Sequence, residues 1–121
     1  MADSPFVPAI FYKKPMLALR WLETAFGFET TMDAELQPGF RWVELGLPGA
    51  ESTIALVAAG DQLPAGIDTG IRLLVGDARA AHRDVAAAGG SVGELLDWPG
   101  VPLMFSFTDP DGNRVYVAEG G

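Results

Sequence analysis

The stretch TDPDGNRVYVAE near the end of the chain carries the residues with the clearest potential for chemistry. Asp109, Asp111 and Asn113 have the D-x-D-x-N spacing with which a calcium loop begins. Such a loop also needs glycine at its sixth position and glutamate at its twelfth, where this chain has arginine and glycine. The PDG letters have the composition of a hairpin turn, so the acidic cluster is predicted to turn the chain.

A few other residues could support catalysis. Glu44 and Glu119 could act as acid and base if burial separated their pKa values, although a surface position is the simpler interpretation of each. The single histidine, His82, falls in the middle of a predicted helix, which favours a partly exposed helix position over a metal ligand. The absence of cysteine excludes disulfides, thiolate metal sites and a cysteine nucleophile. No G-x-S-x-G motif occurs, and no glycine-rich loop precedes a helix.

The composition fits one folded domain. The chain has 121 residues, of which 49% are hydrophobic, and a formal net charge of −8. The negative charge argues against nucleic-acid binding and would favour a cationic ligand, although solubility alone could explain it. The N-terminus lacks the features of a signal peptide and no apolar run reaches the length of a membrane span, so a cytoplasmic protein is expected.

The first half of the chain predicts one helix among four strands. Pro15 opens a segment whose apolar residues recur at helical spacing up to Gly27, a suitable helix end. The strands are predicted in FVPAIFYKK (6–14), FETTMDAEL (28–36), FRWVELGL (40–47) and STIALVAA (52–59), with turns at QPG and PGAE. The order is β-α-β-β-β.

The second half repeats this order after a Gly-, Pro- and Asp-rich linker at 60–69. Strands are predicted in IRLLVG (71–76), SVGELLDW (91–98), VPLMFSFT (101–108) and RVYVAE (114–119), and a helix in DARAAHRDVAAAGG (77–90), capped by Asp77. At a constant offset, identical residues also recur: Ala18 with Ala81, Arg20 with Arg83, Ala25 with Ala88, and Gly27 with Gly90. An internal duplication is therefore predicted.

The fold class expected from this pattern is α+β, with two tandem β-α-β-β-β modules. Residues 1–121 form one domain, with modules at about 5–59 and 70–119. Each module has one helix, so it can cover only one face of its sheet. Curved mixed sheets of this kind could enclose a cleft, which is a natural small-molecule site.

The sequence resembles the vicinal oxygen chelate superfamily of glyoxalases, bleomycin resistance proteins and extradiol dioxygenases. The resemblance rests on FYKKPMLALRWLETAFGFE, on GDARAAHRDVAAAGGSV and, above all, on FSFTDPDGNRVYVAE. In enzymes of this family, four strands supply His, Gln or Glu ligands to one divalent metal. The corresponding positions here read Val7, Ala55, Gly70 and Tyr116. The resemblance therefore implies a relative that has lost the metal site, closest to the bleomycin resistance branch, and we expect no metal and no cofactor.

The expected ligand-binding residues follow from strand alternation. Tyr116 and Arg114 should share one face of the last strand, while Val115 and Val117 face the helix. On the same principle Phe11 and Arg72 should lie on the ligand side of their strands, with Arg72 as an anchor for an anionic or carbonyl-bearing group. The complete predicted set is Phe11, Trp42, Arg72, Trp98, Phe105, Arg114 and Tyr116, although core packing of the aromatics and a salt bridge for Arg72 are alternatives.

Three functions remain open at this point. The first is a metal-independent binding protein that sequesters an aromatic or cationic compound, for which no catalytic residue is expected. The second is a lyase or isomerase of the same superfamily that uses Glu44 or Glu119 as a base. The third is a dimeric scaffold without a ligand. The resemblance also implies a homodimer, and no nucleic-acid or membrane partner is expected.

Overall fold

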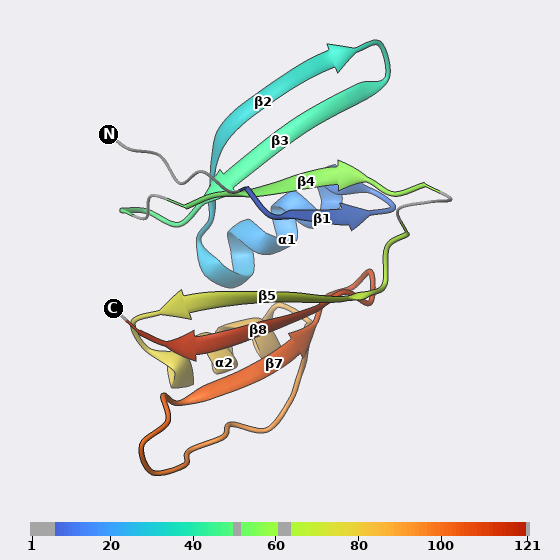
Figure 1. Cartoon of the computed structure of the whole chain (residues 1–121). Coiled ribbons are helices and arrows are strands. Elements are labelled where there is room, and N and C mark those ends of the chain that lie inside the picture. The colour runs from blue at the N-terminus through green and yellow to red at the C-terminus, as the bar shows by residue number, and fades with distance from the viewer. Residues whose placement is uncertain (1–6, 50–51, 61–63, 121) are drawn as a thin grey trace. The chain divides into compact units, whose positions relative to one another are not determined.

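The structure is a computed structural model that describes residues 7–49, 52–60 and 64–120. The chain divides into two compact units, residues 1–65 and 66–121, each of which is built from four strands and one helix. The β-α-β-β-β order predicted for both halves is confirmed (Figure 1). Phe6, residues 50–51 of the predicted PGAE turn and residues 61–63 of the predicted linker lie outside the described residues.

Unit 1 contains a mixed sheet, which we call sheet 1. Its elements are β1 (Ala9–Tyr12), α1 (Pro15–Phe26), β2 (Glu29–Gln37), β3 (Phe40–Gly46) and β4 (Ile54–Ala58), and the strand order is β1-β4-β3-β2. The pairing of β1 with β4 is parallel and the other pairings are antiparallel. Pro15 begins α1, and Gly27 ends it with a positive φ of 77° and an N–H that donates to the carbonyl of Glu23.

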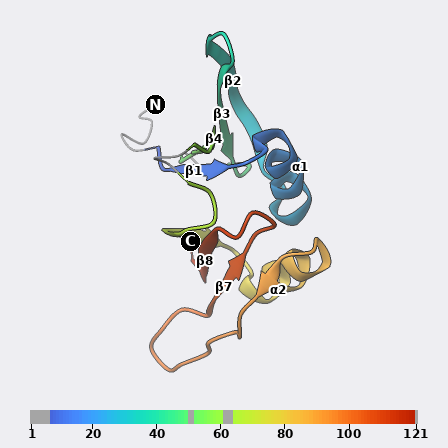
Figure 2. The same cartoon turned by 90° about the vertical axis from the view of Figure 1, so that its right-hand side faces the viewer.

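Helix α1 covers one face of sheet 1 (Figure 2). Its buried residues are Leu19, Leu22 and Ala25. They form the core of this unit with alternate strand residues, namely Ile10, Tyr12, Val43, Leu45, Ile54 and Leu56, none of which is more than 6% exposed. The period of two along each strand therefore separates a core face from a second face that has no helix, the helix-free face.

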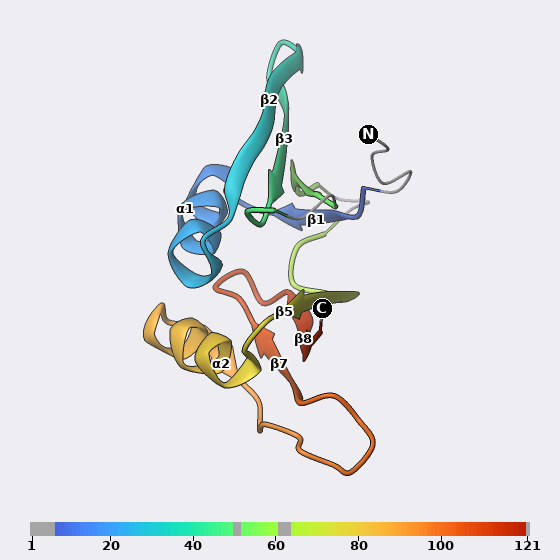
Figure 3. The same cartoon turned by 90° about the vertical axis from the view of Figure 1, so that its left-hand side faces the viewer.

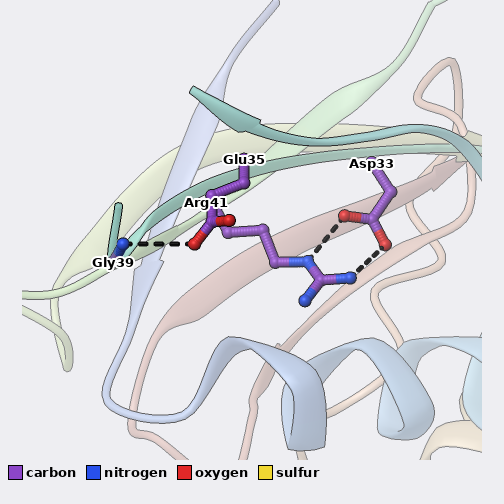
Figure 4. Close-up of polar contacts among 4 residues, drawn as sticks. All are labelled: Asp33, Glu35, Gly39 and Arg41. Atoms are coloured by element: carbon purple, nitrogen blue, oxygen red, sulfur yellow. Dashed lines mark hydrogen bonds and ion pairs between the residues drawn. The ribbon is translucent and has the colours of Figure 1, made fainter. Parts of the chain in front are cut away.

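The β2–β3 hairpin extends beyond β1 and β4 (Figure 3). Across it, Arg41 forms a bidentate pair with Asp33, with distances of 2.6 Å from Nε to Oδ1 and 2.9 Å from Nη2 to Oδ2 (Figure 4). The Glu35 carboxylate accepts a hydrogen bond from Gly39 N–H at the turn (Figure 4). Alternation places these charged side chains on the opposite face from Ala34 and Trp42. The hairpin therefore presents its less polar face on the helix-free side of sheet 1.

Unit 2 repeats the topology in a second mixed sheet, sheet 2. It consists of β5 (Asp68–Val75), α2 (Ala78–Ala87), β6 (Ser91–Val92), β7 (Met104–Thr108) and β8 (Arg114–Glu119), in the order β5-β8-β7-β6. The pairing of β5 with β8 is parallel. As predicted, Asp77 caps α2, with its Oδ1 accepting from Ala80 N–H at 3.0 Å. The core under α2 includes Val85, Val115, Val117, Phe105 and Phe107.

Two segments of unit 2 differ from the sequence-based expectation. β5 begins at Asp68, inside the stretch predicted as linker. The predicted strand at 91–98 is reduced to Ser91–Val92 and one isolated bridge between Leu96 and Met104. The alternating apolar residues there belong to a loop. The loop ends in a turn that starts at Trp98, in which Gly100 follows Pro99 and has a positive φ of 78°.

The DPDGN stretch forms the β7–β8 turn, as predicted. Asp109 Oδ1 accepts hydrogen bonds from the N–H groups of Asp111 and Asn113, each at 3.0 Å. Asn113 is fully buried, and its Oδ1 accepts from Gly66 N–H at 2.8 Å and from Ile67 N–H at 3.1 Å. The turn therefore also holds the segment that leads into β5.

Replacing Asn113 with alanine should destabilise unit 2. The change leaves two backbone N–H groups without their acceptor, which should cost roughly 2–4 kcal/mol of unfolding free energy. Urea denaturation measures this loss, and Gln37→Ala, which removes an exposed amide, is the control. A loss for Asn113→Ala no larger than that of the control would contradict the role given to this side chain.

Candidate functional site

The helix-free face of sheet 1 consists of two rows of side chains that run across its strands. The strand pairings define a charged row of Ala9, Ala55, Glu44 and Met32, and an apolar row of Phe11, Val57, Trp42 and Ala34. Phe11, Trp42 and Glu44 are half-buried. Two of the predicted site residues, Phe11 and Trp42, therefore lie in one row of the same face.

Glu44 is the ionisable residue of these two rows, and its position is fixed by two neighbours. Its Oε2 accepts a hydrogen bond from Trp42 Nε1 at 2.7 Å, and its Oε1 accepts one from Thr53 Oγ1 at 3.1 Å. Within the described residues no cation forms an ion pair with Glu44. A half-buried carboxylate without a countercharge is a natural partner for a cationic group. The sequence analysis did not identify Thr53, although its spacing from Ala55 places it on the same face.

The helix-free face of sheet 2 has the same layout. Its charged row contains Arg72, Tyr116 and Ser106 and ends at Gly93, whose N–H donates to the Ser106 carbonyl; its apolar row contains Leu74, Ala118, Met104 and Leu96. Arg114 lies two residues before Tyr116 on β8, while Val115 and Val117 are buried on the α2 side. The structure thus brings Arg72, Arg114 and Tyr116 to one face, in agreement with the predicted alternation.

Tyr116 is held by a hydrogen bond to Asp68, a residue that the sequence analysis did not select. The Tyr116 hydroxyl donates to Asp68 Oδ2 at 2.6 Å, and Asp68 Oδ1 also accepts from Gly70 N–H at 3.1 Å. The bond from Tyr116, supported by the one from Gly70, lowers the pKa of Asp68. The same bond raises the pKa of Tyr116, an effect that nearby Arg114 partly opposes.

Phe105 and Trp98 do not join these rows. Phe105 is 2% exposed and lies on the α2 side, where its ring meets His82 edge-on with a centroid distance of 5.0 Å. It pairs with Val117 across β7 and β8, so alternation puts its side chain on the other face of the sheet from that of Tyr116. Trp98 is 59% exposed in the β6–β7 loop. Both residues therefore lie outside the two rows, in contrast to the sequence-based expectation.

Two other residues considered for chemistry have structural contacts. Glu119, a candidate base, accepts a hydrogen bond from Ala78 N–H at 3.0 Å and so caps the start of α2, away from the face that carries Tyr116. His82 is half-buried on α2, and its Nε2 lies 2.8 Å from the Gly93 carbonyl. The expected helix position of His82 is therefore confirmed.

The comparisons with known proteins agree with this architecture. The family model of the Glyoxalase/Bleomycin resistance protein/Dioxygenase superfamily matches residues 7–117, and the chain belongs to this superfamily. No curated protein matches the sequence. No helix in the described ranges is long and apolar enough to cross a membrane.

Solved structures show the same fold. A member of this superfamily from Sphaerobacter thermophilus is 27% identical, with a TM-score of 0.83 over 97% of this chain and 98% of that one. TnmS3, an antibiotic binding protein from Streptomyces sp. CB03234, is 22% identical, with a TM-score of 0.74 over 100% and 99% of the two chains. The fosfomycin resistance protein FosX from Listeria monocytogenes is 14% identical, with a TM-score of 0.74 over 100% and 96%. The last two likenesses concern the fold alone.

At the four positions that the sequence analysis matched to the metal ligands of this superfamily, the side chains do not fit a metal. Val7, Ala55 and Gly70 have no side-chain donor atom, and the Tyr116 hydroxyl is bound to Asp68. In the parts of the chain that the structure describes, no three His, Cys, Asp or Glu residues form a group suited to a metal ion.

Replacing Asp68 with asparagine should lower the pKa of Tyr116 toward the ordinary tyrosine value of about 10. In wild-type protein, the Tyr116–Asp68 bond contributes its full stability between the ordinary carboxylate range and about pH 10, the ordinary tyrosine pKa. This contribution is lost as the pH rises through the raised pKa of Tyr116. At the acid end the contribution is lost as the pH falls through the lowered pKa of Asp68.

Absorbance at 295 nm across an alkaline titration measures this effect. Tyr116→Phe identifies the signal of Tyr116, since the only other tyrosine is Tyr12. An unchanged Tyr116 transition in Asp68→Asn would show that the bond does not control its ionisation.

Proposed function

We propose that this protein binds and sequesters a small aromatic or cationic compound without using a metal. The observation that carries the proposal is the arrangement of Trp42 and Glu44 on the helix-free face of sheet 1. Trp42 supplies a large ring, and its hydrogen bond to Glu44 restrains both side chains. Because little ordering is then left to occur on binding, such a pair is suited to a rigid ligand.

The charge and the ring favour a flat cation over a neutral compound. The Glu44 carboxylate retains acceptor capacity beyond its bonds to Trp42 and Thr53 and has no cationic partner in the described segments. An aromatic face next to a carboxylate attracts a cation through two additive effects. The net charge of −8 would further increase the local concentration of such a ligand.

The fold of the antibiotic binding protein TnmS3 and of FosX supports a role in small-molecule binding, at the level of fold only. An enzyme that uses a carboxylate base receives less support. Glu119 is engaged at the start of α2, away from the face that carries Tyr116. The homodimer and the cytoplasmic location remain predictions, which analytical ultracentrifugation and cell fractionation can test.

Binding of thioflavin T, a flat aromatic cation, tests the proposal. Glu44→Gln keeps an acceptor for Trp42 Nε1 but removes the charge, so it should weaken binding about tenfold, in line with roughly 1.5 kcal/mol for a charged contact. Trp42→Ala should weaken it at least as much by removing the ring. Fluorescence titration gives the dissociation constants.

The matched control is Glu23→Gln, which makes the same chemical change at an exposed position on α1. It should leave the dissociation constant within a factor of about two, because an exposed charge across the unit is screened by salt. Equal effects of Glu44→Gln and Glu23→Gln would refute the role of Glu44, and no binding by the wild-type protein would refute the proposed ligand class.

A further inference from the structure

Sheet 2 repeats the two-row layout of sheet 1 with a different charge. The strand pairings equate Ala55 with Tyr116, Ala9 with Arg72, and Glu44 with Ser106. The charged row of sheet 1 thus carries a carboxylate on its third strand in chain order, β3. The charged row of sheet 2 instead carries a guanidinium on its first strand, β5, and a hydroxyl at the position of the carboxylate.

Arg72 is the cation of this face that is available to a ligand. It is exposed, and within the described part of the chain its guanidinium takes part in no hydrogen bond or ion pair. The nearby carboxylate, Asp68, is occupied by Tyr116 and Gly70 and interacts electrostatically with Arg114. Two guanidinium groups against one carboxylate leave this face with a positive charge, in a chain whose net charge is −8.

Ser106 adds a hydroxyl to the same row. It is half-buried and lies next to Tyr116, which separates it from Arg72. Its neighbour on the other side is Gly93, where an added Cβ would approach Ser106 Oγ to 3.2 Å. The glycine therefore leaves the hydroxyl uncrowded, so that it can donate to an acceptor on a ligand.

The apolar row next to this charged row gives a ligand body a surface to contact. Leu74 is 57% exposed and Met104 is half-buried, while the small side chain of Ala118 lies between them. Leucine and methionine can adapt to ligands of different shape, and covering them would remove apolar surface from water.

We propose that the helix-free face of sheet 2 binds an amphiphilic organic anion. The carboxylate, sulfonate or phosphonate of the ligand pairs with Arg72 and accepts a hydrogen bond from Ser106, and its apolar body covers Leu74 and Met104. Arginine suits such a group because its planar fork matches two oxygens at once. The inference rests on the proposed small-molecule function but depends on residues of unit 2 alone.

A pair of fluorescent probes that differ by one charged group tests the inference. The probes are 8-anilinonaphthalene-1-sulfonate and its neutral counterpart N-phenyl-1-naphthylamine, which lacks the sulfonate. Arg72→Gln should raise the dissociation constant of the sulfonate about tenfold and leave that of the neutral probe within about twofold, because only the sulfonate pairs with the guanidinium. Arg83→Gln, on the exposed side of α2, removes the same charge elsewhere and should change neither constant.

A second variant keeps the test independent of Arg72. Leu74→Ala should weaken both probes, because both place their rings on the apolar row. Equal effects of Arg72→Gln on the two probes, equal effects of Arg72→Gln and Arg83→Gln, or no effect of Leu74→Ala would each overturn the inference. Glu44→Gln separates the two proposals: it should not weaken sulfonate binding, and failure of the thioflavin T experiment leaves the result of this one unchanged.

Discussion

The buried amide of Asn113 is the interaction on which the site of unit 2 depends. It accepts hydrogen bonds from the N–H groups of Gly66 and Ile67, and the next residue, Arg114, donates its own N–H to the Ile67 carbonyl. These contacts join the start of β8 to the segment entering β5. They accompany the pairing of Asp68 with Arg114 at the start of the two parallel strands, and a register irregularity between Asp68 and Arg72 then brings Arg72 beside Tyr116. The acidic turn thus holds the entry to β5 against the start of β8.

Strand alternation explains how two units of the same topology can present different chemistry. Each helix covers one face of its sheet, and the period of two leaves the other residues of every strand on the helix-free face. On the helix-free faces Ala55, Val57 and Ala118 are also buried, whereas the half-buried and exposed positions there can change with less cost to stability. In sheet 1 these positions hold a carboxylate next to aromatic rings, and in sheet 2 they hold guanidinium groups next to aliphatic side chains.

Much of the fold could be predicted from the sequence, because helix caps and alternation are local signals. Pro15, Gly27 and Asp77 mark the helix ends where expected. The strand predicted at 91–98 was wrong over most of its length, since alternation of apolar letters cannot distinguish a strand from a loop that packs a few side chains. β5 also began earlier than expected, because its first residues are fixed by the distant Asn113.

The sequence predicted which face of the sheet a side chain lies on where alternation along one strand was enough. It was less successful where the pairing between strands had to be known. The faces of Arg72 and Tyr116 followed from alternation alone. Placing Phe105 required its pairing with Val117, which the sequence does not specify. The partners Asp68 and Thr53 were missed for a similar reason: the first is 48 positions from Tyr116 in the sequence, and the second is nine from Glu44.

The most direct test of the central claim, that the two helix-free faces bind ligands of opposite charge, is amide and indole NMR mapping with each probe in turn. Thioflavin T should shift the indole N–H of Trp42 and the amides of Phe11 and Glu44. The naphthalene sulfonate should shift the amides of Arg72, Leu74 and Ser106 instead. Shifts from both probes at the same residues, or shifts confined to the helix surfaces, would contradict the account.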